Sequence, residues 1–133
     1  MSFSTFLVTE LLQAIAHGEP YAAPETWVGL FNRAGAELSN ADYVRVQVSI
    51  PPGDFPSKWS APLVSAGAGR VENIGTIIWP RATVDWQDVV SVRIYDAETG
   101  GNELARESLP SPKSVSAGEA FRIPNQALKI RIT

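Results

Sequence analysis

The sequence predicts an all-β fold, an antiparallel β-sandwich of jelly-roll type with one short N-terminal helix. The 133 residues include 10 glycines and 10 prolines, and these turn formers divide the chain into short segments. Most of the segments alternate apolar and polar side chains with a period of two, which is typical of half-buried strands. About eight such strands can be counted, which is the number in a jelly roll.

The single predicted helix lies within residues 1–18. Ser4 or Thr5 can cap its N-terminus, and Gly18 followed by Pro20 ends it. Between these caps, apolar residues recur at helical spacing. They are Phe6, Leu7, Leu11, Leu12 and Ile15. Because a helix this short is marginal alone, its apolar stripe must pack on something larger or on a neighbouring subunit.

Strands are expected from residue 26 onward. Residues 26–31 are β-branched and aromatic and predict a buried strand. In residues 43–50 the valines and Ile50 face one way, while Arg45 and its polar neighbours face the other. Further strands are expected at 74–79, 89–96, 103–109, 120–123 and 128–132.

Two of the later strands allow inward and outward positions to be assigned. In residues 89–96 we expect Val90, Val92 and Ile94 to point inward. Arg45, Arg93, Lys129 and Arg131 are all expected to point outward. Outward cations normally keep a sheet face soluble and block edge pairing, and they can also pair with acids across a subunit contact.

A turn at residues 96–102 is the strongest hairpin signal in the chain. Gly100 and Gly101 supply positive φ, and Asp96 can accept hydrogen bonds from the turn backbone. Residues 51–69, in contrast, are rich in proline and glycine and predict an irregular loop. Pro110 and Pro112 are expected to end the strand at 103–109.

The composition excludes several classes of function. Eleven Lys and Arg against 14 Asp and Glu leave a net charge of −3, the wrong sign for nucleic-acid or anionic-membrane binding. The absence of cysteine and the single histidine, His17, exclude thiol chemistry and histidine-rich metal sites. No signal peptide or membrane-spanning run is expected, so the chain should be made in the cytoplasm as a soluble protein.

Candidate catalytic groups are few. Asp85 and Asp88 are the closest pair of carboxylates beside a strand entry, but Asp commonly caps turns, and we favour that interpretation. The acidic residues of the turn at 96–102 do not have the spacing of a calcium loop. We therefore expect no catalytic residue, no metal and no cofactor.

Two aromatic residues in the proline-rich loop are the best candidates for a contact outside the chain. Phe55 and Trp59 can serve as anchors of a protein interface or as a platform for a sugar, and a loop folded back over its own core would also hold them. Together with the helix stripe, they form the predicted interface.

Several motifs resemble a family of small bacteriophage virion proteins described as tail-fibre-like. The helix carries the family's leucine pair, Leu11-Leu12, and the next strand reads Trp27-Val28-Gly29-Leu30. The distinctive Asp-Ala-x-Thr-Gly-Gly-Asn run lies between Tyr95 and Leu104. The closing Pro-Lys-x-Val-x-x-Gly turn begins at Pro112, and the resemblance covers nearly the whole chain apart from the loop at 51–69.

The resemblance implies a non-enzymatic component of the virion, made in the host bacterium. It implies other virion proteins and further copies of the chain as partners, with a homotrimer as one arrangement. Three roles stay open: a tail-fibre-like protein that also contacts the host surface, a capsid decoration (cement) protein, and a carbohydrate-binding module that takes a host glycan. We expect a single domain, 1–133, with the helix in 1–18 and the sandwich in 26–133.

Overall fold

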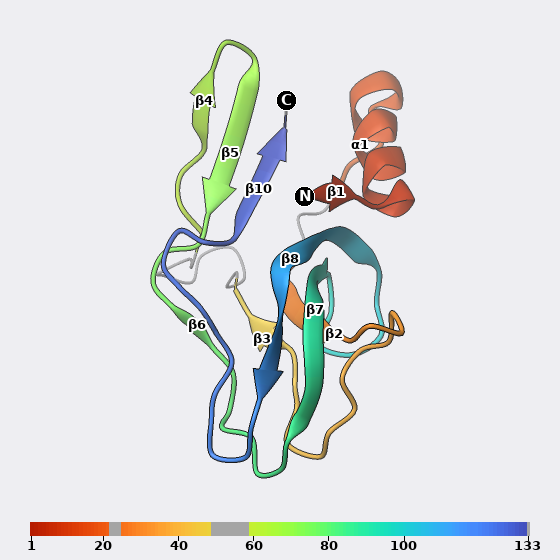
Figure 1. The fold of residues 1–133 in the computed structure, drawn as a ribbon. Coiled ribbons are helices and arrows are strands. Elements are labelled where there is room, and N and C mark those ends of the chain that lie inside the picture. The colour runs from red at the N-terminus through yellow and green to blue at the C-terminus, as the bar shows by residue number, and fades with distance from the viewer. Residues whose placement is uncertain (22–24, 49–58, 133) are drawn as a thin grey trace.

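A computed structural model describes residues 1–21, 25–48 and 59–132. Within them the chain is mostly β, with one short helix and antiparallel strand pairs (Figure 1). The elements are β1 (Ser2–Phe3), α1 (Thr5–His17), β2 (Trp27–Phe31), β3 (Val46–Gln47), β4 (Leu63–Ser65), β5 (Ala68–Glu72), β6 (Ile77–Ile78), β7 (Trp86–Tyr95), β8 (Glu103–Val115), β9 (Arg122–Ile123) and β10 (Lys129–Ile132).

The described strands form three sheets. The largest has the order β1-β8-β7-β2-β3, the second β10-β5-β4, and the third pairs β6 with β9. The predicted β class with an N-terminal helix is confirmed, whereas the jelly-roll sandwich, a finer statement, stays a prediction. In Figure 1, α1 and the β4–β5 hairpin project at the same end of the molecule, where both labelled chain ends also lie.

The core lies on one face of the largest sheet and is closed by residues from the smaller ones. Val28, Leu30, Val89, Val92 and Ile94 come from the two central strands and are buried. Trp79 and Phe121 belong to the same core cluster and meet each other edge to face, with ring centroids 5.3 Å apart. Burial of this set supplies the hydrophobic stabilisation of the fold.

Strand β7 departs from the predicted alternation at one position. Val89, rather than Val90, is fully buried, and Val90 is half-buried. The register against β8 shifts between Val89 and Ser91, and an irregularity of this kind moves side chains to the other face of a strand. The same shift places Pro110 and Pro112 between paired positions of β8, so the strand continues past the prolines that were expected to end it.

The prediction that Arg45 points outward is wrong. Only 7% of its side chain is exposed, while 49% of the neighbouring Val44 is exposed. Regular pairing in this segment is confined to Val46 and Gln47, so the period of two does not extend back to Arg45. The guanidinium instead lies over the ring of Tyr95, 3.8 Å from its centroid, which compensates the burial of a cation.

Candidate assembly surface

Helix α1 begins and ends at the predicted caps. The Ser4 Oγ accepts a hydrogen bond from the Leu7 amide at 3.1 Å, and Gly18 takes the left-handed conformation with φ 67°. Strand β1 attaches the start of the helix to the largest sheet by pairing with β8, and the Ser4 amide donates to the Leu104 carbonyl at 2.8 Å. The helix is therefore fastened at its N-terminal end.

The predicted apolar stripe of α1 divides into an inner and an outer part. Phe6 and Leu7 pack against the core cluster, and Leu11 is half-buried. Leu12 and Ile15 are 59% and 82% exposed, and no residue of α1 is fully buried. The inner residues hold the helix to its own chain, so only the outer two remain available to another molecule.

The loop aromatics have different outcomes. Phe55 lies outside the described residues. Trp59 is half-buried, packs against the core cluster, and donates from its indole Nε1 to the Thr26 Oγ1 at 3.0 Å. Most of the Trp59 side chain is thus engaged within the chain, and its predicted role at an interface stays a prediction.

The β4–β5 hairpin adds apolar surface that the sequence analysis did not single out. Every residue in the run 61–68 is exposed, including 47% of Leu63 and 71% of Val64. Its two-residue turn has positive φ at Ala66 and Gly67, 51° and 80°, as in the tight hairpin turns that favour glycine. The sequence signal for this hairpin is the Ala66-Gly67 pair between two short strands. The many prolines and glycines nearby made the whole segment resemble an irregular loop.

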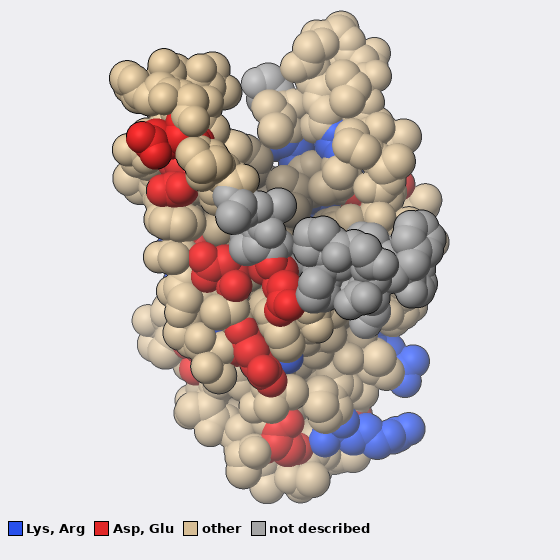
Figure 2. Space-filling model, turned by 180° about the vertical axis from the view of Figure 1, so that it is seen from behind, with Lys and Arg blue, Asp and Glu red and all other residues tan. Residues whose placement is uncertain are grey.

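These two surfaces form separate lobes at one end of the molecule. Figure 2, seen from behind, shows the α1 lobe and the hairpin lobe with a hollow between them, and basic side chains are visible in that hollow. The same view shows acidic side chains along the face below the lobes. Exposed aliphatic side chains on both lobes make this end the candidate assembly surface.

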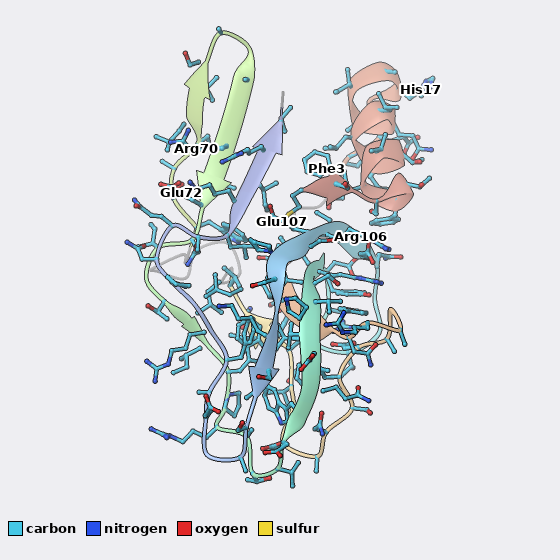
Figure 3. All side chains as sticks on the ribbon, viewed as in Figure 1. Phe3, His17, Arg70, Glu72, Arg106 and Glu107 are labelled. Atoms are coloured by element: carbon cyan, nitrogen blue, oxygen red, sulfur yellow. The ribbon has the colours of Figure 1, made fainter. Side chains whose placement is uncertain are left out.

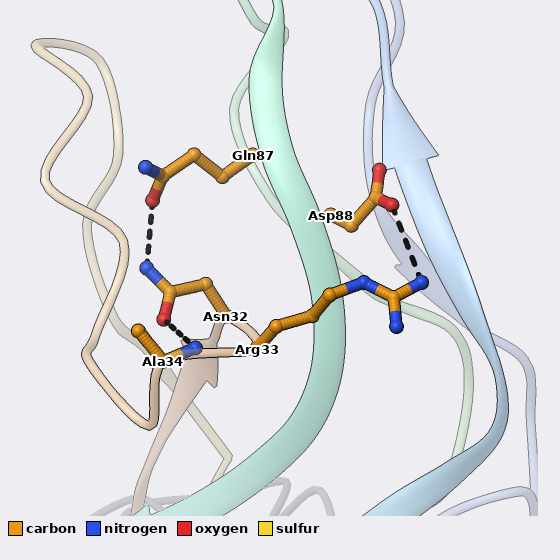
Figure 4. A pocket seen from close by; sticks show the side chains of 5 residues that line it. All are labelled: Asn32, Arg33, Ala34, Gln87 and Asp88. Atoms are coloured by element: carbon orange, nitrogen blue, oxygen red, sulfur yellow. Dashed lines mark hydrogen bonds and ion pairs between the residues drawn. The ribbon is translucent and has the colours of Figure 1, made fainter.

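The carboxylates considered for catalysis have structural partners. The Asp85 Oδ1 accepts a hydrogen bond from the Ala117 amide at 2.8 Å, so Asp85 stabilises a turn, as expected. Asp88 forms an ion pair with Arg33 at 3.8 Å on the rim of an open hollow of about 360 Å³ (Figure 4). In that hollow Asn32 donates to the Gln87 Oε1 and accepts from the Ala34 amide, so its amide group already braces the loop.

The turn at 96–102 is held by side chains from its own ends. The Asp96 carboxylate accepts from the Asn102 amide at 2.6 Å and from the Asn102 side chain at 3.0 Å. Gly100 and Gly101 have φ of 60° and 72°. A side chain at Gly101 would place its Cβ 2.5 Å from Asp96 Oδ1, so only glycine fits there.

Arg45 connects this turn to the rest of the sheet. Its Nη1 donates to the carbonyls of Ala97 and Gly100 at 2.9 and 2.8 Å, and its other nitrogens bind Glu37 at 2.8 and 2.9 Å. Burial alone would raise the pKa of Glu37, but hydrogen bonds from Arg45 and Tyr43 lower that pKa below its ordinary value. We call Arg45, Glu37, Tyr43 and the turn at 96–102 the Arg45 network.

Neither a metal centre nor a membrane-crossing helix is found in the described part of the chain. No group of three or more His, Cys, Asp or Glu side chains is placed to share a metal ion there. No helix among those residues has the length and apolar character to cross a bilayer.

A comparison with protein families identifies the kind of protein that carries these features. The family model described as podophage GP4 fiber I protein gp80 matches residues 2–131. The chain belongs to this family. The tail-fibre-like resemblance drawn from the turn and helix motifs is confirmed, and membership of a phage fibre family associates the chain with the virion. A search of curated proteins found no match.

For this member of the fibre family, the most distinctive sequence motif has a structural role. Asp96, Gly101 and Asn102 build the turn, and Arg45 holds its carbonyls. The outer residues of α1 and the hairpin lobe, in contrast, expose aliphatic side chains that another chain can contact.

Proposed function

We propose that this chain is a structural subunit of a phage tail fibre, present in multiple copies, that joins neighbouring copies through the outer face of α1. Leu12 and Ile15, with their exposure of 59% and 82%, are the observation that carries the proposal. Burying two such aliphatic side chains in each copy would contribute roughly 1.5–3 kcal/mol apiece. Repetition of one contact among identical copies is how most symmetric assemblies form.

A double substitution tests the α1 contact without disturbing the core. Leu12→Ser with Ile15→Ser should leave the circular dichroism spectrum and melting temperature of the purified chain unchanged, because neither side chain is buried. Virions produced with this variant should carry far fewer copies of the chain, measured by quantitative mass spectrometry of purified particles. Gln13→Ala, an exposed change on the same helix, is the control and should incorporate normally.

Normal incorporation of the double variant would overturn the α1 contact. The mass of the purified assembly in solution gives the number of copies in contact, and a homotrimer is one arrangement that the family resemblance implies. Point substitutions test this contact better than deletion of residues 1–18 would, because the deletion would also remove β1 and the core contacts of Phe6 and Leu7.

Contact with the host surface is the second part of the proposal. The family's fibre description supports a location at the tail, where such contact takes place. Antibody labelling of whole particles should place the chain on fibres; labelling spread over the head would replace this role by capsid decoration. Assembled protein should bind host cells or a glycan array above background, and no binding to either would limit the chain to a structural role within the fibre.

A further inference from the structure

The three-stranded sheet β10-β5-β4 has two faces of opposite character. Residues opposite one another in antiparallel strands share a face, so the register assigns each side chain to one face. Arg131 lies opposite Arg70, and Lys129 lies opposite Glu72. The other face is entirely aliphatic among its non-glycine members: Val64, Val71, Ile130 and Ile132.

The charged face carries an excess of cations. It presents Arg70, Lys129 and Arg131 against a single acid, Glu72, in a chain with a net charge of −3. Arg70 forms a 3.6 Å ion pair with Glu72, and both project from β5 (Figure 3). Within the described residues, Lys129 and Arg131 form no ion pair, although Glu107 lines the same hollow of about 200 Å³. Like charges directly opposite each other, as Arg70 and Arg131 are, destabilise a sheet.

The strand that bears Lys129 and Arg131 is an edge of its sheet. Among the described strands, β10 pairs only with β5, so its other side offers unpaired backbone groups. Arg131 and Ile132 are exposed. An incoming strand paired beside β10 would place one side chain next to Arg131 on the charged face and its neighbours next to Ile130 and Ile132 on the aliphatic face.

We propose that β10 binds an extended segment of a different virion protein, whose strand alternates acidic and aliphatic residues. This is strand addition to a sheet edge, in which backbone hydrogen bonds provide affinity and alternate side chains provide specificity. An acidic residue opposite Arg131 relieves the Arg70–Arg131 repulsion, and aliphatic neighbours cover Ile132, which is 58% exposed. The proposed function enters this inference in one respect only, namely that the partner is another protein of the virion.

Two other occupants fit this edge less well. A second copy paired through β10 about a two-fold axis would bring Lys129 and Arg131 against their own equivalents, which is repulsive. A host polysaccharide would be expected to meet aromatic side chains on which sugar rings stack. Two hollows open on this face, one beside Arg70 and Arg131 and one beside Lys129 and Arg131. Among the described residues that line them, none is aromatic.

Short peptides of defined pattern test the proposal on the full-length chain. The probe is a fluorescent seven-residue peptide of alternating valine and glutamate, compared with matched peptides in which glutamine or lysine replaces glutamate. At low salt we expect the glutamate peptide to bind at least about tenfold more tightly than the glutamine peptide. Nuclear magnetic resonance shifts should concentrate on the amides of residues 129–132.

Charge reversal at the edge should reverse the preference. Arg131→Glu should weaken binding of the glutamate peptide at least about tenfold and favour the lysine peptide, and Arg131→Gln should abolish the preference between them. Arg122→Glu makes the same charge change at an exposed position of β9, in another sheet, and should leave binding nearly unchanged.

Three results would overturn the proposal. The first is equal binding of the glutamate and glutamine peptides. The second is an equal loss of glutamate-peptide binding in Arg122→Glu and Arg131→Glu. The third is binding of a phosphorylated sugar as tightly as the peptide, which would assign the site to a polysaccharide. The Leu12→Ser, Ile15→Ser variant should still bind the glutamate peptide. A failure of the α1 contact and a failure of the β10 site are therefore separate outcomes.

Discussion

Two hairpins of this chain, one at 96–102 and one between β4 and β5, are stabilised in opposite ways. The turn at 96–102, between β7 and β8, is bound by Asp96, Asn102 and the buried Arg45. The hairpin between β4 and β5 is exposed along the run 61–68, and no side-chain hydrogen bond is found within its described residues 63–69. The turn at 96–102 is thus stabilised by polar contacts within the chain. The β4–β5 hairpin instead exposes small aliphatic residues that are available for contact with another chain.

Removal of Arg45 should have the largest effect on this comparison. Arg45→Ala leaves Glu37 without its ion pair and the Ala97 and Gly100 carbonyls without their donor. Breaking a buried pair on one side typically costs about 3–5 kcal/mol, so chemical denaturation should show a loss of that size. Arg33→Ala removes a cation whose side chain is 70% exposed and should change stability by less than about 0.5 kcal/mol. A small loss of stability in Arg45→Ala would mean that the turn at 96–102 is stable without contacts from this residue.

The two adjacent glycines of the same turn should differ in their tolerance of a side chain. Gly101→Ala combines a positive φ with a Cβ that would lie 2.5 Å from Asp96 Oδ1 and 2.7 Å from the Ala97 Cβ. We expect a loss of about 2–3 kcal/mol in the free energy of unfolding. Gly100→Ala has the same kind of φ with nothing within 4 Å, so it should lose only about 1 kcal/mol. Equal losses would show that the close approach to Asp96 is relieved at little cost.

Acid should weaken the Arg45 network in a defined pH range. The folded-state pKa of Glu37 lies below its ordinary value of 4.5, so the folded state binds a proton at this site less readily than the unfolded state. Its contribution to stability is complete above pH 4.5 and is lost as the pH falls through the lower folded-state pKa. Melting temperatures measured from pH 6 downward should fall less steeply below pH 4.5 in Glu37→Gln than in the unchanged chain. If the melting temperatures of the two proteins fall in parallel with pH, Glu37 is not the source of the acid sensitivity.

The sequence was informative where local signals and tertiary structure agree. Ser4 and Gly18 bound the helix as predicted, and Gly100, Gly101 and Asp96 form the predicted turn. Arg45 was misassigned because the period of two says nothing about a cation that is buried by an aromatic ring and an acid from elsewhere in the chain. Val90 was misassigned because the register shift in β7 leaves no mark in the alternation.

The candidate surface was predictable in part for a related reason. The helix periodicity selected Leu12 and Ile15 together with Phe6 and Leu7, but which of these residues pack on the core depends on where β1 fixes the helix. The cation excess of the β10 sheet depends on the pairing of Arg131 with Arg70. These residues are 61 positions apart in the sequence, and no local pattern indicates that they meet.

The smallest expected effect concerns the exposed hairpin. Ala66 has φ 51°, a conformation in which asparagine is favoured over alanine, and an Asn-Gly pair suits a two-residue hairpin turn best. Ala66→Asn should therefore stabilise the hairpin by about 0.5–1 kcal/mol, seen as slower amide exchange in residues 63–70 and a slightly higher melting temperature. Ala61→Asn, an exposed change outside the turn, should alter neither. Faster exchange in Ala66→Asn would contradict the turn geometry, whereas slower exchange would show that this hairpin keeps an unoptimised turn, unlike the one held by Arg45.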